Sequence, residues 1–192
     1  MERLPGMTYL HVRKNFPLMK QPFLRIAPRA AFGILCLSGV LCSSLGADAA
    51  APNLLGGGSW ALLSPPGSAH MNGKPAGPSL GVTVVKPAVL YYQIQLTHDI
   101  TAGAPAGTRL RYQFWAKSAT HSTFHAVIEK RTAPYTHFVD QQITLSPVWK
   151  EYAFSTPALA ASKPRAMAAR LQVGQQAGAF DFKDLTVAAI PR

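Results

Sequence analysis

Residues 90–117, LYYQIQLTHDITAGAPAGTRLRYQFWAK, decide the fold. Apolar and polar side chains alternate from Tyr91 to Leu96, and the same alternation returns from Arg109 to Lys117. A period of two residues is typical of a strand with one buried face. Glycine and proline in the intervening TAGAPAG mark a loop. The stretch therefore predicts two neighbouring strands that share an apolar inner face, to which the second strand contributes Leu110, Tyr112 and Phe114.

The outer face of this predicted pair carries an unusual set of residues. Tyr91, Gln93 and Gln95 lie on it from the first strand, and Gln113 and Trp115 from the second. Flat apolar rings stand beside amides that can both donate and accept hydrogen bonds, a combination suited to a sugar ring. An equally open interpretation is that these aromatic residues cover a second packed layer.

The N-terminal residues have the pattern of an export signal. Basic residues dominate positions 1–29, an uncharged apolar run follows over 31–45, and Ala47-Asp48-Ala49 provides small residues for cleavage. This order predicts a bacterial secretory signal peptide over 1–49, with Met19 as a possible true start. The apolar run is shorter than the roughly 20 residues of a membrane helix. We therefore expect a secreted or periplasmic protein without a membrane span after cleavage.

Cleavage would change the composition of the chain. Six of the 19 basic residues and two of the eight acids lie within residues 1–49, so residues 50–192 keep a net charge of +7. Both cysteines would also be removed. A single domain over 50–192 would then have no disulfide and no thiol chemistry, and its core alone would have to stabilise it.

The remaining sequence favours an all-β protein, because short alternating runs are separated by turn residues and no clear helical period follows Ala50. Such a pattern indicates an antiparallel sandwich or barrel. Residues 64–78 are rich in proline and glycine and predict a long loop. Trp149 is expected in the core. Further strands are predicted over 53–55, 80–85, 124–129, 136–145, 149–155, 167–173 and 180–187.

The order of motifs along the chain resembles one family. The motifs are Asn-Leu-Leu at 53–55, Trp60, Leu-x-Val-x-Val at 80–84, Tyr-x-Ile-x-Leu at 92–96, Arg-Leu-x-Tyr-x-Phe-Trp-Ala-Lys at 109–117, Pro-Tyr at 134–135, Leu-x-x-x-Trp-Lys-x-Tyr at 145–152, Leu-x-Val-Gly at 171–174 and Phe-Asp-Phe-Lys-Asp-Leu-x-Val at 180–187. Together they are similar to the CenC-type, family 4/9-like carbohydrate-binding modules.

The resemblance implies a galactose-binding-like jelly roll, a two-sheet antiparallel β-sandwich, with a glycan lying across a concave sheet. It also implies a binding face, which strand alternation places at Tyr91, Gln93, Gln95, Gln113, Trp115, His125, Arg170 and Gln172, with His137 at the rim. Relatives often hold a structural calcium ion near two adjacent acids. Lys183 replaces one of these acids here and only Asp184 remains, so we expect no cofactor and at most a weak calcium site.

Other functions find less support in the sequence. A serine hydrolase would need Gly-x-Ser-x-Gly at a strand-to-helix elbow, which is absent. The few acids in 50–192 do not suggest a glycosidase pair, and His121 and His125 are too far apart along a strand to share a metal. Nucleic-acid binding conflicts with export. We therefore expect a non-catalytic binding module for a polysaccharide such as a β-glucan or xylan, or alternatively a jelly roll that binds another protein or has a structural role in the envelope.

Overall fold

The computed structural model describes residues 51–74, 76 and 78–191, and within them it shows an all-β fold. The predicted signal peptide over 1–49 and the possible start at Met19 lie outside these residues. The secondary structure consists of β1 (Ala61–Leu63), β2 (Ala69–Asn72), β3 (Ser79–Val84), the 3-10 turn η1 (Tyr91–Gln93), β4 (Gln95–Asp99), β5 (Arg109–Lys117), β6 (Thr123–Lys130), β7 (His137–Thr144), β8 (Lys150–Ser155), β9 (Met167–Gln172) and β10 (Gly178–Ile190).

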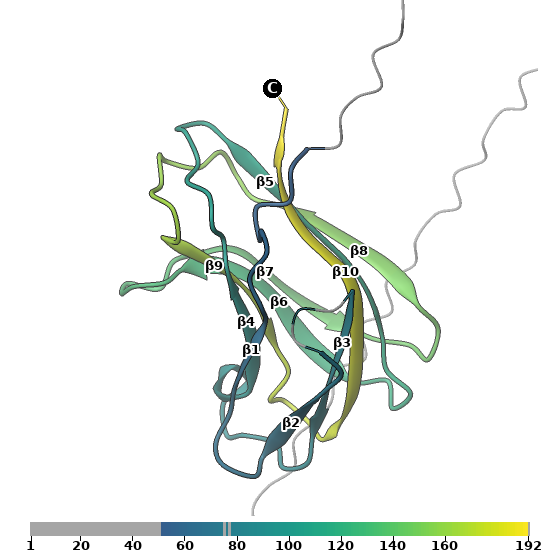
Figure 1. Cartoon of the computed structure of the whole chain (residues 1–192). Coiled ribbons are helices and arrows are strands. Elements are labelled where there is room, and N and C mark those ends of the chain that lie inside the picture. Colours follow the sequence, from purple (N-terminus) through teal and green to yellow (C-terminus); the bar gives the residue numbers. More distant parts are fainter. Residues whose placement is uncertain (1–50, 75, 77, 192) are drawn as a thin grey trace, which may run out of the picture. The chain divides into compact units, whose positions relative to one another are not determined.

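Two five-stranded antiparallel sheets form a β-sandwich of the jelly-roll type (Figure 1). The first, here called the β4 sheet, has the strand order β1-β4-β9-β6-β7, and the second, the β5 sheet, has the order β2-β3-β10-β5-β8. The prediction of a two-sheet antiparallel sandwich is confirmed. In the described part of the chain, no helix has the length and apolar character needed to span a bilayer.

Aromatic side chains join the two sheets in the core. Phe124 of β6 packs edge-on against Phe182 of β10, with ring centroids 5.3 Å apart, and its centroid lies 6.0 Å from that of Phe114 on β5. Leu110, Tyr112 and Phe114 are all fully buried, as the alternation of β5 predicted. The Tyr112 hydroxyl has no hydrogen-bond partner in the described part of the chain, and burial raises the pKa of this tyrosine well above its usual value.

The predicted pairing of residues 90–96 with residues 109–117 is wrong. Strand β4 pairs with β1 and β9, whereas β5 pairs with β8 and β10 in the other sheet. The connection between them, 100–108, crosses from one sheet to the other. Its backbone bonds to the segment that precedes β9, through Ala104 N to Ser162 O and Gly107 N to Leu159 O. Alternation specifies which face of a strand is buried and leaves its partner strand open.

The expected strand over 91–96 begins only at Gln95. In η1 the Gln93 N–H donates to the Leu90 carbonyl at 3.0 Å, and the Leu90 N–H donates to Gln93 Oε1 at 3.1 Å. These local hydrogen bonds curl the backbone before the ladder of β4 starts. Two neighbouring expectations also fail. Residues 54–57 form a turn rather than a strand, and the predicted loop over 64–78 contains β2.

Trp149 was expected in the core and is instead partly exposed. The phase of β8 is opposite to the prediction, because Tyr152 stacks on Phe114 with centroids 5.8 Å apart and so faces inward. Trp149 consequently lies on the outer face, where the Lys117 ammonium is 5.0 Å from its ring centroid. Trp60, only 6% exposed, is the buried tryptophan of the described residues.

The two tryptophans provide a matched test of this packing. Trp60→Ala should lower the free energy of unfolding by about 3–5 kcal/mol, as for other large-to-small changes in cores. Trp149→Ala should cost less than about half of that value, because Trp149 lies on the outer face and is already partly exposed. Urea denaturation of both variants measures the difference. Equal losses, or a larger loss for Trp149→Ala, would contradict the placement of these rings.

Candidate functional site

The outward face of the β4 sheet carries polar residues in three rows across its strands. Antiparallel register places the members of a row next to one another. The first row runs from β1 to β7 through Leu63, Gln95, Gln172, His125 and Gln142. The second comprises Ala61, Thr97, Arg170, Val127 and Asp140, and the third comprises Asp99, Ala168, Glu129 and His137.

A cleft of about 780 Å³ lies over these rows. Its floor includes side chains from β4, β9 and β6, among them Gln95, Arg170 and Glu129, and its sides include tyrosines from η1 and from the hairpin between β6 and β7. Volumes of this size are typical of small-molecule sites. The cleft is open along its length to solvent at Tyr92 and Tyr135, whose exposed fractions are 45% and 61%.

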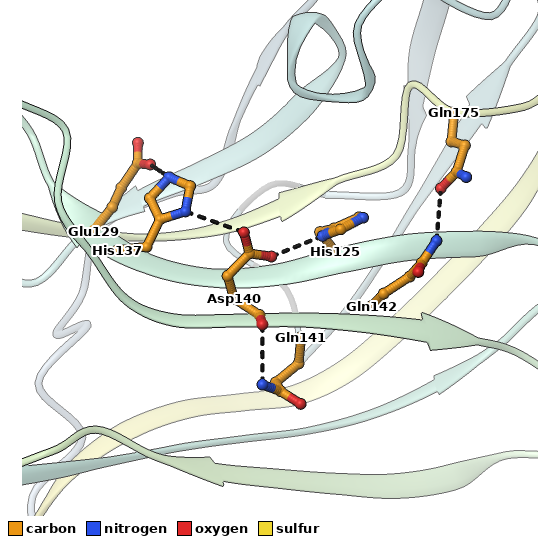
Figure 2. A network of polar contacts seen from close by, with 7 residues as sticks. All are labelled: His125, Glu129, His137, Asp140, Gln141, Gln142 and Gln175. Atoms are coloured by element: carbon orange, nitrogen blue, oxygen red, sulfur yellow. Dashed lines mark hydrogen bonds and ion pairs between the residues drawn. The ribbon is translucent and has the colours of Figure 1, made fainter.

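A chain of charged side chains crosses the floor from β9 to β7. Arg170 Nε lies 2.7 Å from Glu129 Oε1, and His137 Nε2 lies 2.8 Å from Glu129 Oε2. His137 Nδ1 then lies 3.1 Å from Asp140 Oδ2, and the other oxygen of Asp140 is 2.7 Å from His125 Nδ1 (Figure 2). Both ring nitrogens of His137 therefore face carboxylates, and only the imidazolium has a donor for each.

This chain of ion pairs is largely removed from solvent at its centre. The Glu129 side chain is 6% exposed and that of Arg170 13%. The Arg170–Glu129 contact is close but not aligned as a hydrogen bond at Nε. A second acid–base pair on the floor, Asp99 with Arg131 at 2.9 Å, is much more exposed. The paired charges hold the long side chains in place and leave the neighbouring amides as the unpaired polar groups.

Two glutamines on the floor have unpaired buried oxygens. Oε1 of Gln95 on β4 and Oε1 of Gln172 on β9 have no hydrogen-bond partner among the residues that the structure describes. The two residues are directly opposite each other in the β4–β9 ladder. A buried acceptor without a donor costs about 1–3 kcal/mol. Both oxygens are covered in this structure, so a hydroxyl or amide donor from outside the protein would reach them after a small rotation of the two side chains, which line the cleft.

Tyr91 and Tyr92 differ in what they present to the cleft. The Tyr91 ring stacks on His125, with centroids 4.2 Å apart and planes inclined by 20°. Burial, and secondly the charge of Asp140, raises the pKa of the Tyr91 hydroxyl. One face of this ring is thus already covered. Tyr92 contacts Tyr91 edge-on, with ring centroids 5.6 Å apart, and is exposed beside the cleft.

The structure brings together six of the nine residues that the sequence placed in the cleft. These six occupy the outward face of the β4 sheet or its rim, and they are Tyr91, Gln95, His125, His137, Arg170 and Gln172. Whether they bind a glycan stays a prediction.

Three of the nine lie elsewhere, which corrects the predicted arrangement. Gln113 and Trp115 are on β5 and face outward from the β5 sheet, next to Thr186 and Lys183 of β10. They are separated from the cleft because β4 and β5 belong to different sheets. Gln93 is exposed in η1, where its side chain accepts a hydrogen bond from the Leu90 backbone instead of facing the floor.

Sequence reasoning missed several residues of the cleft. Glu129 could have been found, because His125, Val127 and Glu129 alternate on one face of β6. Tyr92 was assigned to the inner face by a strand period that η1 breaks. Nothing in the local pattern marked the contribution of the β6–β7 hairpin. The other missed residues are Leu63, Thr97, Asp99, Arg131, Tyr135 and Asp140.

Metal binding finds no support in a side-chain cluster. Within residues 51–74, 76 and 78–191, no three or more histidine, cysteine, aspartate or glutamate side chains are grouped to hold an ion. Asp184 lies at an irregularity of β10 with φ of 54°, and its N–H donates to the Pro78 carbonyl at 3.1 Å. The expectation of at most a weak calcium site at Asp184 stays a prediction.

Comparison with solved structures identifies the fold. A CBM4 structure matches with a TM-score of 0.57 and 19% identity, over 68% of this chain and 86% of the other. The N-terminal cellulose-binding domain of Cellulomonas fimi β-1,4-glucanase C matches with a TM-score of 0.53 and 16% identity, over 70% and 90%. The chain has the fold of carbohydrate-binding modules.

A further structure, the ligand-free BiXyn10A CBM1, matches with a TM-score of 0.53 and 13% identity, over 71% of this chain and 94% of the other. No family model and no curated protein matches the sequence. The likeness to carbohydrate-binding modules therefore rests on the arrangement of the two sheets.

The buried charge at the centre of the cleft should contribute to stability. Glu129→Gln removes the anion between Arg170 and His137, so it leaves a largely buried guanidinium without its counter-charge. Breaking such a pair costs about 3 kcal/mol or more. Asp99→Asn is the matched control, because its pair with Arg131 is exposed and contributes at most about 1 kcal/mol. Thermal and urea unfolding compare the two, and equal effects would contradict the assigned role of Glu129.

Proposed function

We propose that this protein is an exported, non-catalytic binding module that holds a neutral polysaccharide chain, of the β-glucan or xylan class, in the cleft of the β4 sheet. The observation that carries the proposal is the pair of unpaired buried oxygens on Gln95 and Gln172. Sugar hydroxyls are donors of the required kind, and a row of them along a chain matches acceptors on neighbouring strands.

The tyrosines at the edges of the cleft supply the apolar half of the interaction. Tyr92 of η1 and Tyr135 of the β6–β7 hairpin both line the cleft and are exposed. The C–H face of a pyranose is apolar, and a rigid ring stacks on it with little loss of entropy. Trp115, which the sequence assigned to this task, is on the other sheet. The stacking partners in the proposed site are therefore the tyrosines.

The acids of the cleft support binding without catalysis. Glycoside hydrolysis needs one carboxylic acid to donate a proton and a second carboxylate to act as base or nucleophile. Here Glu129 contacts Arg170 and His137, Asp99 contacts Arg131, and Asp140 contacts two histidines. Each carboxylate is thus already engaged with a basic side chain. The site is also open to solvent at Tyr92 and Tyr135, which suits an affinity nearer micromolar than nanomolar.

Export follows from the predicted signal peptide over 1–49, which supports a role outside the cytoplasm. There the module would attach itself, and any partner it carries, to a polysaccharide.

Affinity electrophoresis in gels containing soluble β-glucans or xylans tests the proposal. We expect retention of the protein, and Gln95→Ala and Tyr92→Ala should each weaken binding about three- to tenfold, the value of one hydrogen bond or one ring contact. Gln113→Ala and Trp115→Ala are the matched controls from the other sheet. They should bind like the parent, and melting temperatures check that all four variants are folded.

Three outcomes would contradict the proposal. Loss of binding in Trp115→Ala with normal binding in Gln95→Ala would move the glycan site to the β5 sheet. Hydrolysis of the retained polysaccharide would overturn the non-catalytic role. Absence of retention on every β-glucan and xylan would favour recognition of another protein by this cleft.

A further inference from the structure

The outer face of the β5 sheet carries a second cluster of aromatic residues, which the proposed glycan cleft does not use. We call Trp115, Lys117, Trp149 and Lys183 the indole patch. The Lys183 ammonium lies 4.9 Å from the ring centroid of Trp149 and 5.5 Å from that of Trp115. The Lys117 ammonium lies 5.0 Å from the Trp149 centroid. Two flexible cations are therefore held at defined positions by two rigid rings.

The charges of the patch are available to a ligand. Lys183 has no carboxylate partner among the described residues, and Lys117 is 3.8 Å from Asp181 with both side chains partly exposed. A pair of that length and exposure contributes little. The register of β10 and β5 places Lys183 beside Trp115 and Asp181 beside Lys117. The patch thus combines at least one free ammonium with exposed ring surface.

A hollow of about 310 Å³ adjoins the patch, lined by Lys117 and Trp149 together with polar groups of Asn72, Ser79 and Asp181. Gly81 keeps its floor open. A Cβ atom there would lie 3.1 Å from Asp181 Oδ1 and 3.3 Å from Asn72 Cβ, so a side chain would crowd two residues that line the hollow. The volume is at the lower end for ligand sites and suits about one sugar unit.

The two outward faces of the sandwich differ in charge. The cleft of the β4 sheet has the acids Asp99, Glu129 and Asp140 against two arginines. On the β5 sheet the outward cations are Arg109, Arg111, Lys117 and Lys183, and the outward acids are Asp181 and Glu151. Glu151 is hydrogen-bonded to Gln113. An anionic ligand is therefore complementary to the β5 face and not to the cleft.

From this geometry we propose that the indole patch is a second binding site, which takes an acidic polysaccharide whose sugar units carry carboxylate or sulfate groups. On binding, the ammonium groups of Lys183 and Lys117 move from the Trp149 ring to the anionic substituent of a sugar unit, and the apolar face of that unit rests on the ring. Because the two sheets face away from each other, one protein can hold a neutral chain on the β4 sheet and an acidic chain on the β5 sheet.

Affinity electrophoresis at low salt provides the test, with polygalacturonate as the carboxylate probe and dextran sulfate as the sulfate probe. Methyl-esterified polygalacturonate is the matched neutral polymer. We expect retention by at least one acidic polymer, with markedly weaker retention by the ester and at 0.5 M salt. Retention by one acidic polymer alone identifies which anion the site takes.

Variants locate the binding. Lys183→Gln should weaken retention about three- to fivefold, the effect of losing one exposed ion pair. Trp149→Leu should weaken it comparably, and its melting temperature shows whether it is folded. Lys163→Gln is the control, because it removes the same charge from the exposed segment before β9. Gln95→Ala should leave acidic binding intact, which separates this site from the proposed cleft.

Several results would overturn the second site. Equal weakening by Lys163→Gln and Lys183→Gln would show attraction by net charge alone. Retention that survives both Lys183→Gln and Trp149→Leu would place the anion elsewhere. Tighter Lys183-dependent binding to anionic phospholipid vesicles or to nucleic acid than to either acidic polysaccharide would assign the patch to a different partner.

Discussion

The packing of Phe124 against Phe114 and Phe182 is the contact on which the rest of the structure depends. It joins β6 of one sheet to β5 and β10 of the other and so fixes the two sheets face to face. Once the inner faces of the two sheets are packed together, every second side chain of each strand points outward from its own sheet. The molecule consequently has two outward faces with separate chemistry, an amide and carboxylate face on the β4 sheet and an indole and ammonium face on the β5 sheet.

Much of the fold could be predicted from the sequence because burial alternates so regularly. The all-β class and the inward residues of β5 can be predicted because side chains alternate with a period of two, which is visible in the local sequence. The local sequence does not show which strands pair with one another. The strands β4 and β5 follow each other along the chain and have similar patterns, yet residues 100–108 carry the chain across the sandwich. This is why Gln113 and Trp115 were assigned to the wrong face.

Two other errors have different causes. Gln93 bonds to the Leu90 backbone and forms a turn, so the strand period fails over η1 and Tyr92 lines the cleft together with Tyr91. Glu129 was missed because a charged residue is rarely buried without a partner, and Arg170 and His137 provide such partners here. The partners of Glu129 come from β9 and β7, whereas Glu129 itself lies on β6. The sequence of any one of these strands therefore does not predict that Glu129 is buried.

The buried ion pairs and the unpaired amides of the cleft are parts of one arrangement. The chain from Arg170 to His125 holds the β9, β6 and β7 side of the floor by paired charges, whereas Gln95 and Gln172 are held by the strand ladder with free acceptors. A ligand then meets polar groups that are already positioned, which reduces the entropy lost on binding. The proposed neutral glycan and the proposed acidic glycan differ because their faces differ in charge.

The most direct test of the central claim, that the β4 sheet carries the glycan site, is a nuclear magnetic resonance titration of isotopically labelled protein with cellohexaose and with xylohexaose. The side-chain amide signals of Gln95 and Gln172 and the indole signals of Trp115 and Trp149 report separately on the two faces. The account predicts that at least one of the two sugars shifts the glutamine amides saturably and leaves both indoles unchanged. Saturable shifts of the indoles with unmoved glutamine amides would contradict it.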